Sequence, residues 1–350
     1  MKKRTIIVIG ASTGGLDALK KLIGALPPDL AASVFVVWHI APSGRGIVPD
    51  VLGRVTTIPV TNAYNGQLIQ TNHIYIAPPD HHLLLEDGYV RVSRGPKENR
   101  FRPAIDPLFR SAAYIYGNQV IGVVLTGALD DGTAGLWTIK QRGGLALVQD
   151  PAEAEVPSMP ESAIREVAVD YVLPIARLAT TLTRLVGEDV PEAAPVSPAD
   201  DKRTAIEIGI AAEAKALDTP IFEFGQLSPF TCPECHGVLT VLKEGTLSRF
   251  RCHTGHAYSA DTLLASLTEA VEDRLYDAIR GMAESVMLMN HIGDHYAEAN
   301  QPRQAAFYFQ RAKEAEQRID LVRRVALSQQ TLSQENIDQP EPVADSPPAS

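Results

Sequence analysis

Long apolar runs and positive charge are scarce in this chain of 350 residues. No stretch approaches the roughly 18 consecutive apolar residues that a membrane span needs. The run after the basic start MKKR ends at a Gly/Ser turn, too early for a signal peptide. The 42 acidic and 32 basic side chains give a formal net charge of -10, which disfavours nucleic-acid binding. We therefore expect a cytoplasmic protein with no nucleic-acid partner and no membrane insertion.

Cysteine is also scarce, and all three cysteines lie between residues 232 and 252. An odd, clustered count does not form a disulfide framework, and in a cytosolic chain it indicates metal binding. Cys232 and Cys235 form a C-x2-C pair, and Cys252 with His256 forms a second pair. The segment between the pairs is typical of a hairpin that turns at Glu244-Gly245 and returns the second pair to the first.

This layout predicts a zinc ribbon that holds one structural zinc ion in a closed tetrahedral site. The predicted ligands are Cys232, Cys235, Cys252 and His256. His253 is adjacent to a cysteine and is expected to point away from the ion. The alternative is three reduced, buried cysteines with no metal. So short a segment has little apolar core of its own, which favours the metal.

Residues 1–187 alternate short β-branched runs with stretches of helical period. These runs are apolar throughout, which favours strands covered on both faces and hence a mostly parallel sheet. The expected fold class is α/β, a doubly wound sheet. The predicted strands are TIIVIG (5–10), SVFVVW (33–38), HIYIA (73–77), QVIGVVL (119–125) and LALVQ (145–149), with helices at 16–26 and 134–143 and an added hairpin element at 86–93.

Composition divides the remainder of the chain into further parts. A stretch rich in Pro, Ala and acidic residues indicates a linker, and two later stretches repeat apolar residues at steps of three and four, as in an antiparallel helical hairpin. The last residues cannot form a core. The expected parts are a linker (188–203), a short helix with the zinc-ribbon-like module (204–262), a helical hairpin broken at ANQP (263–328) and a disordered tail (329–350).

A serine lies between glycines directly after the first predicted strand. Gly10-Ala11-Ser12-Thr13-Gly14 fits the G-x-S-x-G turn that exposes a nucleophile at the carboxyl edge of a sheet. The N–H of Thr13 and the following helix N-terminus could stabilise an oxyanion. A tight packing turn or a phosphate cradle are the alternatives, although the chain lacks the G-x-G-x-x-G dinucleotide pattern.

A serine nucleophile needs a base and an orienting acid. His39 ends the second predicted strand, and neighbouring parallel strands place their carboxyl ends side by side, so His39 can lie beside Ser12. The Asp130-Asp131 pair follows the strand 119–125 at the same edge. A structural histidine and an Asp-Gly turn with a helix cap are the alternatives.

Six motifs now indicate a family. IGASTGG, WHIAP, YIAPPDHHLLL, FRPAIDPLFRSAA, VVLTGALDDGTAGL and QDPAEAEVPSMPESAI occur in this order. Over about residues 1–187 the chain resembles the catalytic domain of the chemotaxis receptor methylesterase, CheB. The resemblance implies hydrolysis of glutamate γ-methyl esters on the cytoplasmic helices of methyl-accepting chemoreceptors, with glutamine deamidation in many members. It also implies other chemotaxis signalling proteins as partners.

The resemblance assigns roles to residues of this chain. It implies Ser12 as the nucleophile, His39 as the base and Asp131 as the orienting acid. It adds a second oxyanion donor, the backbone N–H of Ala128, beside that of Thr13. No cofactor is expected for catalysis. A chain ending near residue 187 is expected to keep basal esterase activity.

This sequence departs from the family pattern in three places. The resemblance starts at residue 5, so no N-terminal receiver domain is predicted. The loop before the acid reads T-G-A-L-D-D-G, with Leu129 where the family has glycine, which puts the loop shape in question. A long extension follows the catalytic domain. The altered loop favours an alternative function, a weakly active or inactive CheB-like binding module. Arg102 and Arg110 are interpreted either as cleft residues or as solvated surface.

Overall fold

A computed structural model describes residues 3–44, 46–190, 195–213 and 223–328. The chain forms two compact units, residues 1–263 and 264–350, which are described separately. The predicted disordered tail (329–350) lies outside the described residues. In the described part of the chain, no helix is long and apolar enough to span a membrane.

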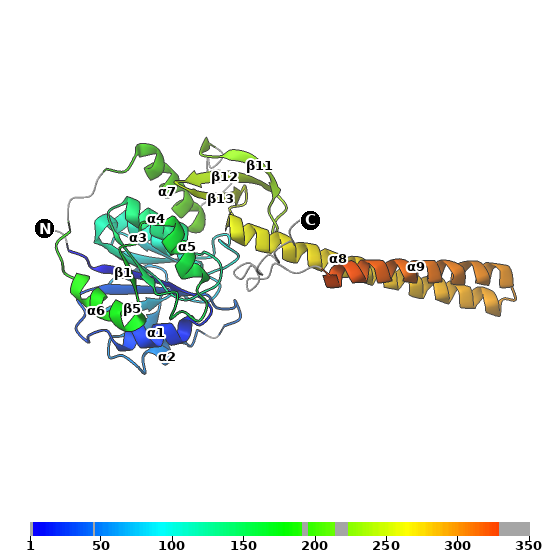
Figure 1. The fold of residues 1–350 in the computed structure, drawn as a ribbon, viewed down its shortest axis with the longest axis horizontal. Helices are drawn as coiled ribbons and strands as arrows, with labels where there is room; N and C mark the ends of the chain where they lie inside the picture. Colours follow the sequence, from blue (N-terminus) through cyan, green and yellow to red (C-terminus); the bar gives the residue numbers. More distant parts are fainter. Residues whose placement is uncertain (1–2, 45, 191–194, 214–222, 329–350) are drawn as a thin grey trace, which may run out of the picture. The chain divides into compact units, whose positions relative to one another are not determined.

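A parallel seven-stranded sheet forms the centre of the first unit (Figure 1), in the order β10-β9-β8-β1-β2-β5-β3. The predicted α/β fold is confirmed, and each of the five predicted strands is present within a residue or two of its expected bounds. The short strands β3 and β10 were not predicted. The strands are β1 (Ile6–Ala11), β2 (Ser33–Trp38), β3 (Val60–Asn62), β5 (His73–Ile76), β8 (Val120–Val124), β9 (Leu145–Gln149) and β10 (Tyr171–Leu173).

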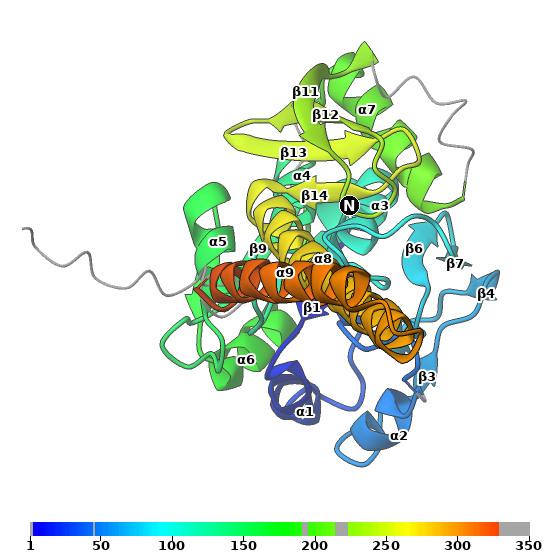
Figure 2. The ribbon, with the colours of Figure 1, turned by 90° about the vertical axis from the view of Figure 1, so that its right-hand side faces the viewer.

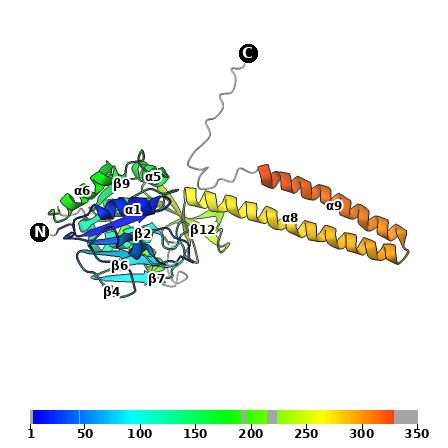
Figure 3. The same ribbon diagram turned by 90° about the horizontal axis from the view of Figure 1, so that it is seen from below.

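Helices cover both faces of this sheet (Figures 1 and 3), and each face has its own apolar cluster. One cluster packs Leu19 of α1 and Leu178 of α6 against the sheet, and the other packs Phe109 of α3 and Ile139 of α4. The continuous apolar strands are explained by this double cover. The helices are α1 (Gly15–Gly24), α2 (Val48–Leu52), α3 (Ile105–Tyr116), α4 (Thr133–Gln141), α5 (Ser158–Glu166) and α6 (Ile175–Leu185).

Two smaller sheets extend the first unit. The predicted hairpin element is part of a three-stranded sheet of β4 (Gln67–Leu68), β6 (His82–Glu86) and β7 (Tyr89–Ser93). The second small sheet, visible at the top of Figure 2, is antiparallel and contains β11 (Gln226–Thr231), β12 (Val238–Glu244), β13 (Leu247–Cys252) and β14 (Ala257–Ser259). It has the predicted turn, with Gly245 at a φ of 61°.

The helix before this antiparallel sheet begins earlier than expected. Helix α7 (Pro198–Ala211) starts inside the predicted linker, because Ser197 caps it by accepting a hydrogen bond from the N–H of Asp200 and a proline follows the cap. The remaining linker residues that are described have no helix. Residues 214–222 lie outside the described residues.

The predicted helical hairpin is present as α8 (Ala260–Glu298) and α9 (Pro302–Ser328), with the break at the expected ANQP segment. In the second unit, both helices contribute to one apolar cluster that includes Ile279, Val286, Ala312 and Ile319. On each helix the two residues are seven positions apart, two helical turns, which places them on one face.

Candidate active site

The turn after β1 places Ser12 at the carboxyl edge of the sheet. Gly14 has a φ of 73°, which a side chain would disfavour, and α1 begins at the next residue. A Cβ on Gly15 would lie 2.7 Å from that of Ala11 and against Trp38. The Trp38 indole donates to the Ser12 carbonyl over 2.9 Å. The glycines therefore permit a tight turn. Ser12 is 8% exposed, more buried than the sequence predicted.

His39 follows β2, the strand beside β1, and its ring contacts Ser12 as predicted. Nδ1 lies 3.0 Å from the Ser12 Oγ, and Nε2 lies 2.8 Å from Oδ2 of Asp131. A carboxylate accepts only, so Nε2 carries the hydrogen and Nδ1 is left as the acceptor for the serine proton. The Phe101 ring stacks on the imidazole with centroids 3.7 Å apart. These contacts hold the imidazole in one orientation and one tautomer.

Asp131 follows β8, the strand on the other side of β1, and receives several hydrogen bonds. Its Oδ2 accepts from the Ile105 N–H at 2.7 Å, and its Oδ1 accepts from the Asn99 amide at 2.8 Å and the Gly132 N–H at 2.9 Å. Burial alone would raise its pKa, but the bond and charge of His39 and the other donors hold the pKa of Asp131 below its usual value. Asp131 is therefore a buried, ionised partner for His39.

The neighbouring Asp130 has a different environment. It is 9% exposed and accepts a hydrogen bond from Ser259 Oγ at 2.7 Å. Burial raises the pKa of Asp130 to about 7. In the described part of the chain, the carboxylate that contacts His39 belongs to Asp131, which supports the predicted choice between the two acids.

The loop with the altered family pattern keeps a left-handed conformation. Leu129 has a φ of 63°, the region that glycine would occupy without strain. A Cβ on Gly127 would lie 2.6 Å from the Ser12 Cβ, so the loop packs directly on the serine. Within the described residues, the N–H groups of Thr13 and Ala128 donate to no backbone carbonyl. Both remain candidates for the oxyanion site.

Sequence reasoning missed Phe101 and Asn99, and it misplaced Arg110. Arg110 is 1% exposed and pairs with Glu98, so neither the cleft nor the solvated-surface interpretation holds for it. Arg102 pairs with Asp80 at 2.6 Å and is 18% exposed in its side chain. Phe101 and Arg110 lie in the FRPAIDPLFR motif, but nothing in its spacing shows which residue each one contacts.

The four predicted metal ligands come together near the antiparallel sheet. Ligand atoms of Cys232, Cys235, Cys252 and His256 all lie within 4.8 Å of one another. Each pair lies in a tight turn, in which the Cys232 N–H donates to Gly237 O and the Cys252 N–H donates to His256 O. These four side chains could hold a metal ion. The adjacent His253 packs its ring where a Cβ of Gly237 would be, consistent with its predicted exclusion.

Comparisons with known proteins now add to this geometry. The CheB methylesterase family matches residues 7–182, which is half of the chain. The chain belongs to the CheB methylesterase family. A relative from Leptospira interrogans is 42% identical over 180 residues, covering 51% of this chain and 93% of that protein.

A named enzyme and a solved structure are also similar to this chain. The protein-glutamate methylesterase/protein-glutamine glutaminase 2 of Anaeromyxobacter dehalogenans is 40% identical over 51% of this chain and 53% of its own length. The crystal structure of the Thermotoga maritima CheB methylesterase catalytic domain is 35% identical, with a TM-score of 0.51, and covers 53% of this chain and 100% of that one. The predicted family is thus confirmed, and the match leaves the antiparallel sheet and helical hairpin outside it.

Proposed function

We propose that this CheB-family protein hydrolyses glutamate γ-methyl esters on chemoreceptor helices and deamidates receptor glutamines. The observation that carries the proposal is the Ser12–His39–Asp131 chain of contacts, 3.0 Å and 2.8 Å long, at the carboxyl edge of the sheet. Acyl transfer by a serine requires a nucleophile, a base and an orienting acid, and these three side chains are in the contacts that the reaction needs. Receptor helices of this kind are cytoplasmic, so the cytoplasm is the expected location.

The chemistry proceeds in two stages. His39 Nδ1 takes the Ser12 proton while Oγ attacks the γ-carbonyl, and the proton then leaves with methanol, or with ammonia from glutamine. In the second stage water attacks the acyl-serine while His39 takes its proton. His39 then gives this proton to Ser12 Oγ as the acyl bond breaks and glutamate is released. The N–H groups of Thr13 and Ala128 stabilise the oxyanion in both stages, and Asp131 stabilises the imidazolium. No cofactor is needed.

We further propose that Cys232, Cys235, Cys252 and His256 hold a structural zinc ion. Three sulfurs and one imidazole form a donor set that zinc favours, and all four sites would be filled by protein. Cys232 and Cys252 are fully buried, which suits a closed site. The ion would stabilise the fold of the antiparallel sheet and leave no position open for substrate.

One observation favours an inactive binding module instead. Leu129 holds a strained backbone beside Ser12, at the loop that presents the Ala128 donor. The loop nevertheless keeps the left-handed turn, and the three side chains of the proposed triad are in contact. The binding module is therefore the second candidate.

Methyl release from methylated receptor by the purified full chain tests the proposal. We expect Ser12→Ala to lower the rate by at least about a thousandfold, because the nucleophile is removed. Ser43→Ala, at an exposed serine, is the matched control and should leave the rate unchanged. Equal rates in the two variants would contradict a serine mechanism.

The neighbouring acids give a second matched pair. Asp131→Asn removes the acceptor that selects the His39 tautomer and should lower kcat by roughly three to four orders of magnitude. Asp130→Asn should have a small effect, because that residue contacts Ser259. A larger loss in Asp130→Asn would reassign the acid.

A further inference from the structure

The segment Lys97–Asn99 lies between the proposed catalytic acid and the metal-binding sheet. We call residues 223–262 the ribbon module. This module lies outside the half of the chain that the family match covers, but it contacts the segment Lys97–Asn99 of the α/β domain. Shortly after this segment, Phe101 stacks on His39 and the Ile105 N–H donates to Asp131. The contacts around Asn99 show what the module could contribute to catalysis.

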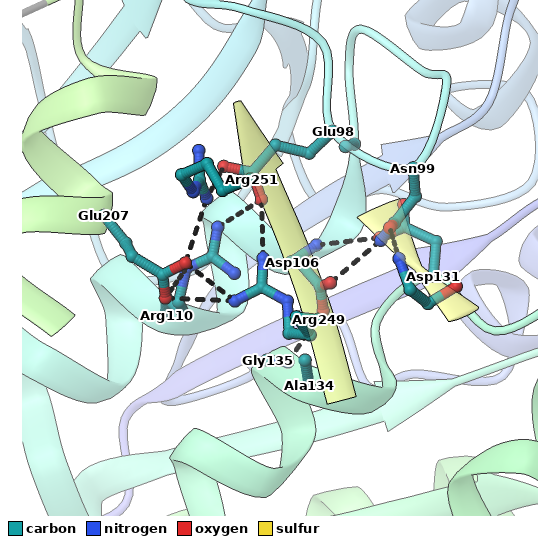
Figure 4. A network of polar contacts seen from close by, with 12 residues as sticks. Glu98, Asn99, Asp106, Arg110, Asp131, Ala134, Gly135, Glu207, Arg249 and Arg251 are labelled. Carbon is teal, nitrogen blue, oxygen red and sulfur yellow. Dashed lines mark hydrogen bonds and ion pairs between the residues drawn. The ribbon is translucent and has the colours of Figure 1, made fainter. Parts of the chain in front are cut away.

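The Asn99 side chain connects the two regions through both ends of its amide, and Figure 4 shows the end that faces Asp106 and Asp131. Its NH2 group donates to Asp131 Oδ1 at 2.8 Å and to Asp106 Oδ2 at 2.9 Å. Its carbonyl oxygen accepts from the Ser259 N–H of β14 at 3.0 Å. The Ser259 N–H can only donate and the Asp131 carboxylate can only accept, so the two contacts select the same orientation of the amide. A residue of the ribbon module therefore orients a donor to the catalytic acid.

The backbone of this segment is paired with β14 as well. Glu98 forms a parallel bridge with Ala257, in which the Ala257 N–H donates to Lys97 O at 3.2 Å and the Asn99 N–H donates to Ala257 O at 2.8 Å. Asn99 has a φ of 48°, a left-handed conformation that asparagine tolerates better than most residues. The position of Asn99 is thus set by the strand that it pairs with.

Buried ion pairs hold the same segment from its other side. The Glu98 carboxylate is fully buried and accepts from Arg251 at 2.9 Å and Arg249 at 3.3 Å, both on β13, and from Arg110 of α3. Figure 4 shows these side chains converging on Glu98 next to Asn99. A buried carboxylate without these cations would be costly, so the segment is bound to the module at residue 98 too.

The proposed metal site lies directly before the paired strand. His256 is one of the four ligands, and Ala257 of the bridge is the next residue. Arg251 is adjacent to the ligand Cys252 and donates to Gly255 O at 2.8 Å within the same ligand turn. An ion bound there would fix the turn from which β14 starts.

We propose that Asn99 is a positioning residue for Asp131 and that the ribbon module, stabilised by its metal, holds Asn99 in place. The module therefore contributes to the catalytic rate without contacting substrate. This inference rests on the proposed function for its kinetic consequence, whereas its structural consequence is independent of any activity. It also differs from the expectation that residues up to 187 suffice for the basal activity.

Asn99→Asp in the full chain tests the positioning role. The change is isosteric and suits the left-handed conformation, but it replaces two donors with an oxygen that repels Asp131 and Asp106. We expect kcat to fall about 10- to 100-fold with KM unchanged, because the lost bonds act on the acid and not on substrate. A normal kcat, or a loss confined to KM, would overturn the role.

Asn72→Asp is the matched control. Asn72 also has a left-handed φ, of 58°, and its amide donates to Pro28 O, but it precedes β5 at the end of the sheet opposite to the triad. The same chemical change there should leave kcat and KM unaltered. An equal loss of kcat in both variants would show that general destabilisation explains the effect, and would contradict the proposal.

Hydrogen exchange of the full chain tests the link to the module without any activity measurement. Removing the metal with a chelator should accelerate exchange of the Asn99 N–H at least about tenfold, because its acceptor is Ala257 O, while the N–H groups of β1 keep their protection. Unchanged exchange at Asn99 in metal-free protein would refute the link. If the wild-type chain released no methanol but Asn99 exchange rose, the proposed function would fail and the structural link would stand.

Discussion

The α/β domain (residues 3–187) and the ribbon module bury different kinds of side chain. The α/β domain encloses two large apolar clusters, one on each face of its parallel sheet. Within the described residues of the ribbon module the buried apolar side chains are few, among them Leu239, Leu242 and Tyr258, and one small cluster joins Leu242 of β12 to Ile210 of α7. Beside it lie the fully buried charges of Arg249, Arg251 and Glu207.

This difference follows from size. A short antiparallel sheet cannot remove enough apolar surface from water to offset its chain entropy, so it needs other stabilising contacts. Buried ion pairs lose most of their attraction to desolvation, but removal of one partner leaves an uncompensated buried charge and is strongly destabilising. The α/β domain should therefore tolerate loss of single polar contacts away from the module, whereas the module and the segment that pairs with it should depend on the proposed metal and on the buried charges.

The largest expected effect is loss of the metal. His256→Ala should abolish binding of about one zinc ion per chain and expose the strands β11 to β14 to rapid hydrogen exchange, because structural zinc contributes on the order of 10 kcal/mol to such folds. The strands of the parallel sheet should stay protected. His253→Ala, at the neighbouring histidine, is the control and should retain the metal. If zinc-free wild-type protein kept slow hydrogen exchange in β11 to β14, the ribbon module would not depend on a metal for its stability.

A smaller effect is expected from the buried charges. Glu98→Gln removes one of the two buried carboxylates that Arg110, Arg249 and Arg251 share, the other being Glu207. The change should lower the free energy of unfolding by about 3–5 kcal/mol. Glu188→Gln is the control, because Glu188 is 39% exposed in its side chain where it pairs with Arg4. Its loss should cost at most about 1 kcal/mol. If urea denaturation gave similar losses of unfolding free energy for Glu98→Gln and Glu188→Gln, the buried ion pairs would contribute no more than an exposed pair.

The smallest expected effect concerns strain within the α/β domain. Leu129→Ala and Leu129→Gly remove the same buried side chain to within a methyl group, but only glycine is free of strain at a φ of 63°. We expect Leu129→Gly to be more stable than Leu129→Ala by about 1 kcal/mol in urea denaturation. If Leu129→Ala were the more stable variant, the left-handed backbone at residue 129 would not be strained.

Local sequence patterns were sufficient for much of the α/β domain. Apolar runs predicted the strands, because a strand covered on both faces needs apolar residues at every position. Ser12 and His39 could be placed together, because each follows a strand and neighbouring parallel strands end at one edge. The four candidate metal ligands of the ribbon module were likewise predicted from spacing, because C-x2-C and C-x3-H turns can each present two ligands to one ion.

Only the tertiary structure decided what surrounds Asp131, the proposed catalytic acid. Glu98 and Arg251 are 153 residues apart, and Asn99 and Ser259 are 160 apart, so no periodicity or local motif connects them. Arg110 was interpreted as a cleft or surface residue from its place in the FRPAIDPLFR segment, whereas its buried partner Glu98 is identified only by the folded structure. The sequence by itself predicted the five long strands of the parallel sheet, the proposed triad of Ser12, His39 and Asp131, and the four side chains that could hold a metal ion. Long-range packing decided the pairing of β14 with residues 97–99 and thereby the orientation of Asn99 toward Asp131. Hydrogen bonds between such distant segments form only when the folded chain brings them together, so the local sequence around each segment does not predict them.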